Sequence, residues 1–177
     1  MRRWLGLALL LVAAGCARPG FQASRTLLSN AGLNSAYPDT YPSISGDGRY
    51  IVFSSVRSGT ESIYLYDTRE RRLLDLPGIN ANNFATSQPD ISADGRWIVY
   101  LSNALGKSEV FLYDRSNGAV ENISASIPGD VRHPRISGDG RWIVFESNGL
   151  GQWHIEVFDR GEAVLTSAPQ VSPSSTP

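Results

Sequence analysis

The stretch Pro89-Asp90-Ile91-Ser92-Ala93-Asp94-Gly95-Arg96-Trp97-Ile98-Val99-Tyr100 occurs in three versions along the chain. The first version runs from Pro42 to Phe53, and the third runs from Pro134 to Phe145. The interval is 47 residues between the first two versions and 45 between the last two. Self-similarity at such a period is typical of repeat proteins, in which each unit is one supersecondary structure. The repeated unit therefore decides the fold.

Each unit predicts four antiparallel strands. The Pro-x-Ile-Ser segment reads as a short strand with proline at its start, where a strand tolerates it. An Asp-Gly dipeptide follows and suits a tight hairpin, because glycine accepts the positive φ that the turn requires. The next run is apolar on both faces, which indicates a strand that is covered on both sides. The third and fourth strands are expected at Ile63–Asp67 and Arg72–Leu76, Val110–Asp114 and Ala119–Ile123, and Ile155–Asp159 and Ala163–Thr166.

Four-stranded units of this length are typical of propeller blades. We expect an all-β fold, a partial β-propeller of three four-stranded antiparallel blades over residues 37–167. One extra N-terminal strand is expected at Arg25–Leu28, within a linker of residues 16–36, because its sequence is similar to Arg71-Arg72-Leu73-Leu74. Residues 168–177 are rich in serine and proline and predict a disordered tail.

The N-terminus has the features of an export signal. Two arginines precede an apolar run from Trp4 to Ala14, which is about half the roughly 20 residues that a transmembrane helix requires. We therefore expect a secretory signal peptide over residues 1–15.

Cys16 is the only cysteine, and it stands where the apolar run ends. The segment Val12-Ala13-Ala14-Gly15-Cys16 resembles the lipobox of bacterial lipoproteins. The resemblance implies that a lipid on Cys16 anchors the exported protein to a membrane, and the lack of aspartate after Cys16 favours the outer membrane. The alternative is an ordinary signal peptide, cleaved after Gly15 or nearby, that happens to contain a cysteine.

The charge of the chain bears on its partners. Without residues 1–15 it has 14 basic and 17 acidic residues, a net charge of −3. Nucleic-acid binding requires a concentration of positive charge, so we expect no nucleic-acid partner. A single cysteine forms no internal disulfide, so burial alone must stabilise the fold.

The repeated charged residues have a structural interpretation. In each unit an arginine after the turn precedes the aspartate that ends the third strand by 18 residues, which predicts a cross-strand ion pair. The turn aspartate can accept hydrogen bonds from nearby backbone N–H groups. The loops lack the adjacent carboxylates typical of calcium sites, so we expect no metal and no cofactor. The repeated scaffold positions are Asp47, Gly48, Arg49, Asp67, Asp94, Gly95, Arg96, Asp114, Asp139, Gly140, Arg141 and Asp159.

The sequence offers no recognisable catalytic centre. A Ser-His-Asp hydrolase needs a histidine that is oriented by an acid and adjacent to an activated nucleophile, and neither His133 nor His154 stands in such a setting. We expect no enzymatic activity. Tyr50, Trp97 and Trp142 occupy one equivalent position, where we expect packing between blades rather than a ligand cage.

The candidate binding surface is where the three units differ. The loops between the second and third strands differ, and so do the long connections Pro77–Gln88 and Ser126–His133. A propeller places both sets on one face, opposite the Asp-Gly turns. The candidate binding residues on this face are Phe84, Lys107 and Trp153.

The pattern Pro-x-Ile-Ser-x-Asp-Gly-Arg-x-Ile-Val-Phe, followed by x-Tyr-x-Tyr-Asp, resembles the WD-like propeller repeats of the TolB family. The resemblance covers about residues 37–167, and the interval between the two aspartates is 20 in every unit. It implies a periplasmic scaffold that binds envelope proteins. The alternative is an accessory carbohydrate- or peptide-binding module that serves a secreted hydrolase or lyase. Closed propellers have four to eight blades, and one arrangement that closes the ring is a homodimer with six.

Overall fold

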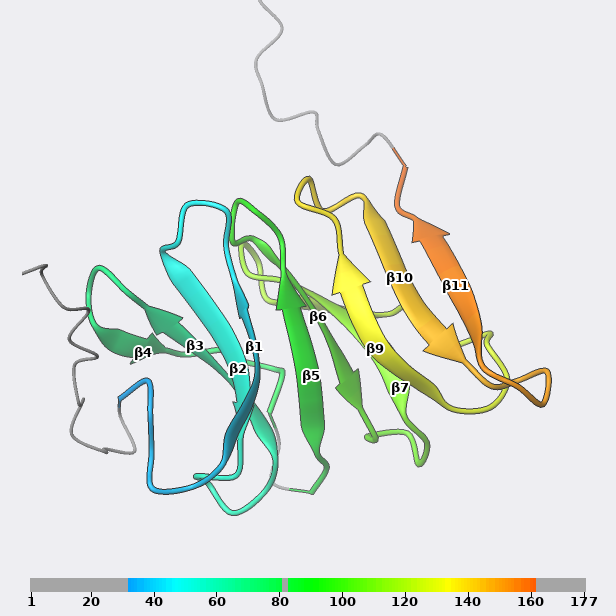
Figure 1. Cartoon of the computed structure of the whole chain (residues 1–177), viewed down its shortest axis with the longest axis horizontal. Coiled ribbons are helices and arrows are strands. Elements are labelled where there is room, and N and C mark those ends of the chain that lie inside the picture. The colour runs from blue at the N-terminus through cyan, green and yellow to red at the C-terminus, as the bar shows by residue number, and fades with distance from the viewer. Residues whose placement is uncertain (1–31, 81–82, 162–177) are drawn as a thin grey trace, which may run out of the picture.

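The computed structural model describes residues 32–80 and 83–161, which form eleven β-strands in three antiparallel sheets and no helix (Figure 1). The first blade consists of β1 (Asp39–Ile44), β2 (Tyr50–Ser55), β3 (Ser62–Asp67) and β4 (Arg72–Leu74). The second blade consists of β5 (Thr86–Ile91), β6 (Trp97–Ser102), β7 (Glu109–Asp114) and β8 (Ala119–Asn122). The third blade consists of β9 (Val131–Ile136), β10 (Trp142–Ser147) and β11 (His154–Asp159).

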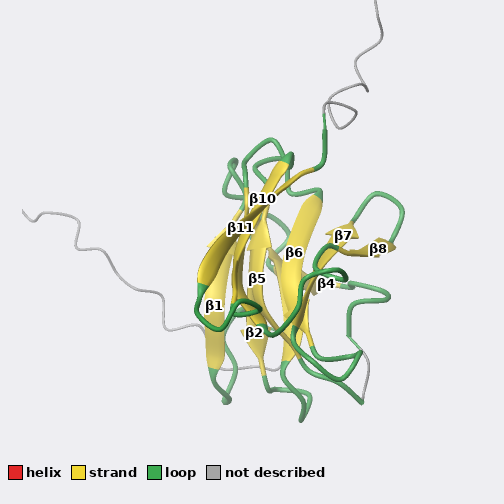
Figure 2. Ribbon diagram, turned by 90° about the vertical axis from the view of Figure 1, so that its right-hand side faces the viewer, coloured by secondary structure: helices red, strands yellow, loops and turns green. Residues whose placement is uncertain are grey.

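This architecture confirms the prediction of an all-β partial propeller with three blades. The first strands, β1, β5 and β9, lie next to one another (Figure 1). The fourth strands β4 and β8 lie on the side away from them (Figure 2). The expected strands at Arg25–Leu28 and Ala163–Thr166, the signal peptide and the tail lie outside the described residues. Within the described ranges, no helix could cross a membrane.

The prediction that proline begins the first strand of each blade is wrong. Each of these strands begins three residues before its proline. The residues that precede the prolines, Tyr41, Gln88 and His133, have φ values of 51°, 50° and 53°, and the strand register shifts there. A β-bulge therefore carries the strand past a residue that has no N–H to donate.

The bulge also connects neighbouring blades. It directs the backbone N–H of Gln88 to the hydroxyl of Ser54 in the first blade, at 3.1 Å. In the same way, the N–H of His133 donates to the side-chain oxygen of Gln88, at 2.8 Å. These hydrogen bonds add to a left-handed backbone that Tyr41 of the first blade adopts without a preceding blade.

A serine and an aspartate close each hairpin turn. The hydroxyl of Ser45 donates to Asp47 at 2.7 Å and accepts the N–H of Tyr50 at 3.0 Å. Hydrogen bonds from the Arg49 N–H and the Ser45 hydroxyl hold the pKa of Asp47 below its usual value. Ser92–Asp94 and Ser137–Asp139 repeat the arrangement. The repeated serines are therefore part of the scaffold.

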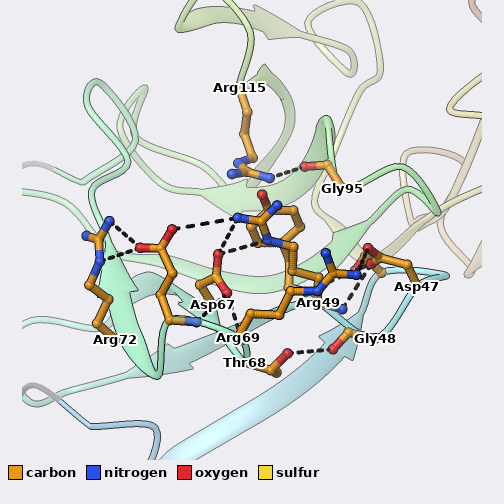
Figure 3. Close-up of polar contacts among 12 residues, drawn as sticks. Asp47, Gly48, Arg49, Asp67, Thr68, Arg69, Arg72, Gly95 and Arg115 are labelled. Atoms are coloured by element: carbon orange, nitrogen blue, oxygen red, sulfur yellow. Dashed lines mark hydrogen bonds and ion pairs between the residues drawn. The ribbon is translucent and has the colours of Figure 1, made fainter.

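The cross-strand ion pairs are present in all three blades. Figure 3 shows Arg49 beside Asp67, with their side chains 3.0 Å apart. Arg96 binds both carboxylate oxygens of Asp114, at 3.0 and 2.8 Å, and this pairing lowers the pKa of Asp114 to about 2. Arg141 likewise forms a bidentate pair with both carboxylate oxygens of Asp159 and lowers the pKa of Asp159 to about 2.

An aromatic ring and a glycine form the contact between successive blades. A Cβ on Gly95 would lie 2.5 Å from the ring of Tyr50, and a Cβ on Gly140 would lie 2.5 Å from the ring of Trp97. Arg160 stacks on Trp97 at 3.6 Å and donates to the carbonyl of Gly140. We call this arrangement the aromatic–glycine contact.

Arg115 makes the equivalent contacts between the first two blades. It stacks on Tyr50 at 4.1 Å. It also donates to the Gly95 carbonyl (Figure 3). Beside each aromatic–glycine contact, the apolar strands of adjacent blades form a buried core. The packing expected for the equivalent aromatic residues is therefore present at Tyr50 and Trp97. It is not present at Trp142, whose side chain is 41% exposed, because no further blade follows among the described residues.

The aromatic–glycine contact predicts an unequal cost for two alanine substitutions. Gly140→Ala and Gly118→Ala both place a side chain at positive φ, 74° and 75°, which costs about 1 kcal/mol each. Only Gly140→Ala also meets the Trp97 ring, because a Cβ on Gly118 would contact nothing within 4 Å. We expect a further loss of about 1–3 kcal/mol for Gly140→Ala in urea denaturation. Equal losses would contradict the contact.

Acid should weaken the fold through Asp114. Its pKa is about 2 in the folded chain and about 3.9 when unfolded, so its ion pair stabilises the fold above pH 4, and this contribution is lost as the pH falls toward 2. We expect the free energy of unfolding to differ between wild type and Asp114→Asn by up to about 2 kcal/mol at pH 6. The difference should shrink toward pH 2 in urea denaturation. Asp75→Asn, at an exposed aspartate, is the control. If the free energy of unfolding differed between wild type and Asp114→Asn by the same amount at every pH, the result would argue against the ion pair.

Candidate interaction face

The loops where the repeats differ gather on one side of the molecule, as the sequence predicts. These are the loops 56–61, 103–108 and 148–153 and the connections 75–80, 83–85 and 123–130, which we call the loop face. The three Asp-Gly turns lie at the opposite ends of the strands, at the top of Figure 1. Sequence variation is therefore segregated from the repeated turns.

Asparagine side chains join the loops to the connections. The amide oxygen of Asn103 accepts the N–H of Ala85 at 2.8 Å, and the backbone N–H of Asn103 donates back to the Ala85 carbonyl at 3.3 Å. Asn148 makes the same two contacts with Asp130, at 2.8 and 3.1 Å. The loops of the second and third blades are thus fixed against the connections that lead to the first strands of those blades.

The three sequence-predicted binding residues occupy different environments. The ammonium of Lys107 donates to the Ile127 carbonyl at 2.9 Å and lies 3.5 Å from Glu109, so it holds a connection in place. Phe84 is half-buried in the first connection. Trp153 is 41% exposed at the end of its loop. Of the three, Trp153 presents the largest free apolar surface.

Trp153 is supported from one side by charged residues of the third blade. The guanidinium of Arg132 stacks on its ring at 3.8 Å. Glu146 accepts from Arg132 at 2.6 Å and lies 3.2 Å from Nδ1 of His133. Arg132, and after it His133, lower the pKa of Glu146. Glu146 thus contacts both His133 and Arg132, and its bond to Arg132 orders the guanidinium against the indole.

Two exposed leucines on this face were missed by sequence reasoning. Leu105 and Leu150 occupy equivalent loop positions and are 67% and 79% exposed. Each precedes a glycine at positive φ in a turn closed by the glycine N–H, at 3.0 and 2.9 Å. The first blade has Ser58 there. The signal was the shared Asn-x-Leu-Gly sequence, which places an apolar side chain in a turn that otherwise needs none.

The described residues offer little for metal chemistry. No group of three or more His, Cys, Asp or Glu side chains among residues 32–80 and 83–161 is arranged to hold an ion. The loop face presents instead two leucine tips and one indole on ordered loops. Such a surface suits contact with another macromolecule rather than the enclosure of a small ligand.

Comparison with solved structures places the fold among bacterial and archaeal propellers. The match with TolB from Acinetobacter baumannii covers 71% of this chain and 30% of the TolB chain, with a TM-score of 0.58 and 21% sequence identity. The putative TolB from Agrobacterium tumefaciens matches 70% of this chain and 46% of its own, with a TM-score of 0.59 and 23% identity. The match with the propeller domain of the Trilobed protease from Pyrococcus furiosus covers 70% of this chain and 39% of the protease chain, with a TM-score of 0.51 and 15% sequence identity. The topology of that domain is described as open velcro.

This chain therefore spans less than half of each of these proteins, and at such identities the likeness shows the fold alone. No curated protein matches it significantly. The family model for the TolB β-propeller domain, in contrast, matches residues 22–177, which is most of the chain. With three blades built on its repeat, the chain belongs to the TolB β-propeller family.

Proposed function

We propose that this protein is a lipid-anchored scaffold of the bacterial cell envelope that binds other envelope proteins through its loop face. The observation that carries the proposal is the exposure of Leu105, Leu150 and Trp153 on that face. Membership of the TolB family supports a propeller used for protein interaction on the periplasmic side of a membrane.

Trp153 has the properties of a binding hot spot. Tryptophan and arginine are enriched among the residues that dominate binding energy, and here Arg132 stacks on the indole while Glu146 holds Arg132. An aromatic side chain ordered before binding loses less conformational entropy when a partner covers it. Leu150 is exposed on the same loop as Trp153, and Leu105 is exposed on the equivalent loop of the second blade.

The membrane anchor rests on the N-terminal sequence. The apolar run and the segment Val12–Cys16 support lipidation of Cys16 after removal of residues 1–15. A lipid contributes about 0.8 kcal/mol per buried methylene, so several acyl chains retain a folded domain at a bilayer. The propeller would then face the periplasm while it remains attached to the membrane.

Loop-face binding predicts a selective loss of captured partners. The full chain, expressed in a Gram-negative host, is cross-linked in cells and purified, and captured envelope proteins are quantified by mass spectrometry. We expect the double variant Leu150→Ser and Trp153→Ala to lower capture by at least about tenfold, since one hot spot contributes about 2 kcal/mol or more. Val120→Ser is the matched control, because Val120 is 43% exposed but lies in β8, outside the loop face. Equal capture by wild type and the double variant would refute the proposed face.

Lipidation predicts that Cys16→Ser releases the protein from membranes. Cells that express either form are grown with labelled palmitate and separated into membrane and soluble fractions. We expect label and membrane association with wild type and neither with Cys16→Ser, because Cys16 is the only thiol in the chain. An unlabelled wild type would indicate an ordinary signal peptide.

A further inference from the structure

The third blade has a blade-contacting face that nothing covers among the described residues. Leu65 and Leu112, on the first and second blades, are 0% and 2% exposed because the next blade packs on them, whereas the equivalent Val157 is 61% exposed. Ile155 is 69% exposed, although its equivalents Ile63 and Val110 are buried. With the exposed Trp142, these residues form what we call the forward face of the third blade.

The first blade has the complementary face open. Gly48 has the same left-handed backbone as Gly95 and Gly140, with φ of 71°, 72° and 74°. A Cβ on Gly95 or Gly140 would strike an aromatic ring of the preceding blade, but a Cβ on Gly48 would meet no atom within 4 Å. Ile44 is 56% exposed, although its equivalents Ile91 and Ile136 are buried. We call this side of the first blade its rear face.

The two open faces are halves of one contact. The internal contacts join an aromatic forward residue to a rear glycine, Tyr50 to Gly95 and Trp97 to Gly140. Trp142 has no such glycine and Gly48 has no such ring within the described chain. On the rear face, a hollow of about 230 Å³ lined by Leu33, Ile51 and Phe53 among others is open to side chains of a covering blade.

We propose that a second copy of this chain covers both faces, so that two copies form one ring of six blades. The forward face of each third blade packs on the rear face of the other copy's first blade. Closed propellers have four to eight blades, and six is the only multiple of three in that range. A head-to-tail contact of this kind closes when its rotation matches the ring, and here a two-fold axis relates the copies.

The backbone supports the same continuation. The N–H of Gly46 donates to the Ala93 carbonyl, and the N–H of Ala93 donates to the Gly138 carbonyl, each at 2.9 Å. The next bond in this row joins the Gly138 N–H to the Gly46 carbonyl of the second copy. Trp142 of one copy then lies on Gly48 of the other, as Trp97 lies on Gly140.

The junction between copies lacks one element of the internal contacts. Thr68 stands where Arg115 and Arg160 stand in the later blades, and its hydroxyl donates to the Gly48 carbonyl at 3.0 Å (Figure 3). No guanidinium from this position can cover the ring of Trp142. Each junction is therefore weaker than an internal one, and the dimer should dissociate before the blades unfold.

The mass of the purified full chain in solution tests the ring. We expect sedimentation equilibrium to give about twice the mass that denaturing mass spectrometry gives for one chain, and the mass of one chain for both Trp142→Ala and Gly48→Ala. Trp153→Ala is the matched control for the first variant, because both indoles are 41% exposed. Gly59→Ala is the control for the second, since it also places a side chain at positive φ in open space. Both controls should stay dimeric, and circular dichroism should show all variants folded.

Two results would overturn the proposal. A monomeric wild type would mean that a segment outside the described residues, or a different protein, covers the forward face. Loss of the dimer in Trp142→Ala with retention in Gly48→Ala would indicate contact between two third blades, which does not close a ring.

Cross-linking gives an independent measurement. Ideal Cβ atoms on Gly46 and Gly138 lie 2.9 and 3.4 Å from the Cβ of Ala93, so equivalent positions across the junction approach the separation of about 3.8 Å that a disulfide needs. In the full chain with Cys16→Ser, the pair Gly46→Cys and Gly138→Cys should oxidise to covalent dimers, and neither single variant should. Absence of covalent dimer from the pair, or equal cross-linking by a single variant, would contradict the ring.

Discussion

The structure depends on one steric constraint, the placement of an aromatic ring of one blade where the next blade has a glycine. The glycine serves twice, because it provides the positive φ of the hairpin turn and leaves the space that the ring fills. An arginine from the next blade covers the ring and bonds the carbonyl of the same glycine. The distance and register between blades are set at this point, and the buried core of apolar strands follows from it.

Sequence reasoning succeeded where the interactions are local. The spacing of 18 residues predicts the pairing of Arg96 with Asp114, because two antiparallel strands joined by one loop bring these positions side by side. The bulges at Gln88 and His133 were not predictable in this way. A residue before proline ordinarily avoids the helical backbone region and favours extended conformations. Tyr41, Gln88 and His133 are nevertheless all left-handed, although only the last two have a preceding blade that accepts their N–H groups. The ammonium of Lys107 likewise finds a carbonyl in a connection 20 residues away.

The two ends of the strands have different chemistry, and the difference separates scaffold from function. At the turn end, Ser, Asp and Arg side chains satisfy one another in every blade. In the described part of the chain, no buried side-chain nitrogen or oxygen is left without a partner. Because these polar side chains already bond one another, they leave few hydrogen-bonding groups for a ligand. At the loop end, backbone and asparagine contacts fix the loops, and the side chains that differ between repeats, such as Leu150, point to solvent.

The outer blades of a repeat array must end in a polar surface or be covered. The third blade does not end in a polar surface, because Trp142, Ile155 and Val157 remain apolar where a next blade would pack. Full burial of such side chains contributes about 1.5–3 kcal/mol each, which is enough to favour a covering partner. In a two-copy ring, the first junction brings the second pair of faces together, so the second forms at a high effective concentration. A junction that has Thr68 in place of a stacking arginine can therefore hold the ring closed, because each copy contributes to two such junctions at once.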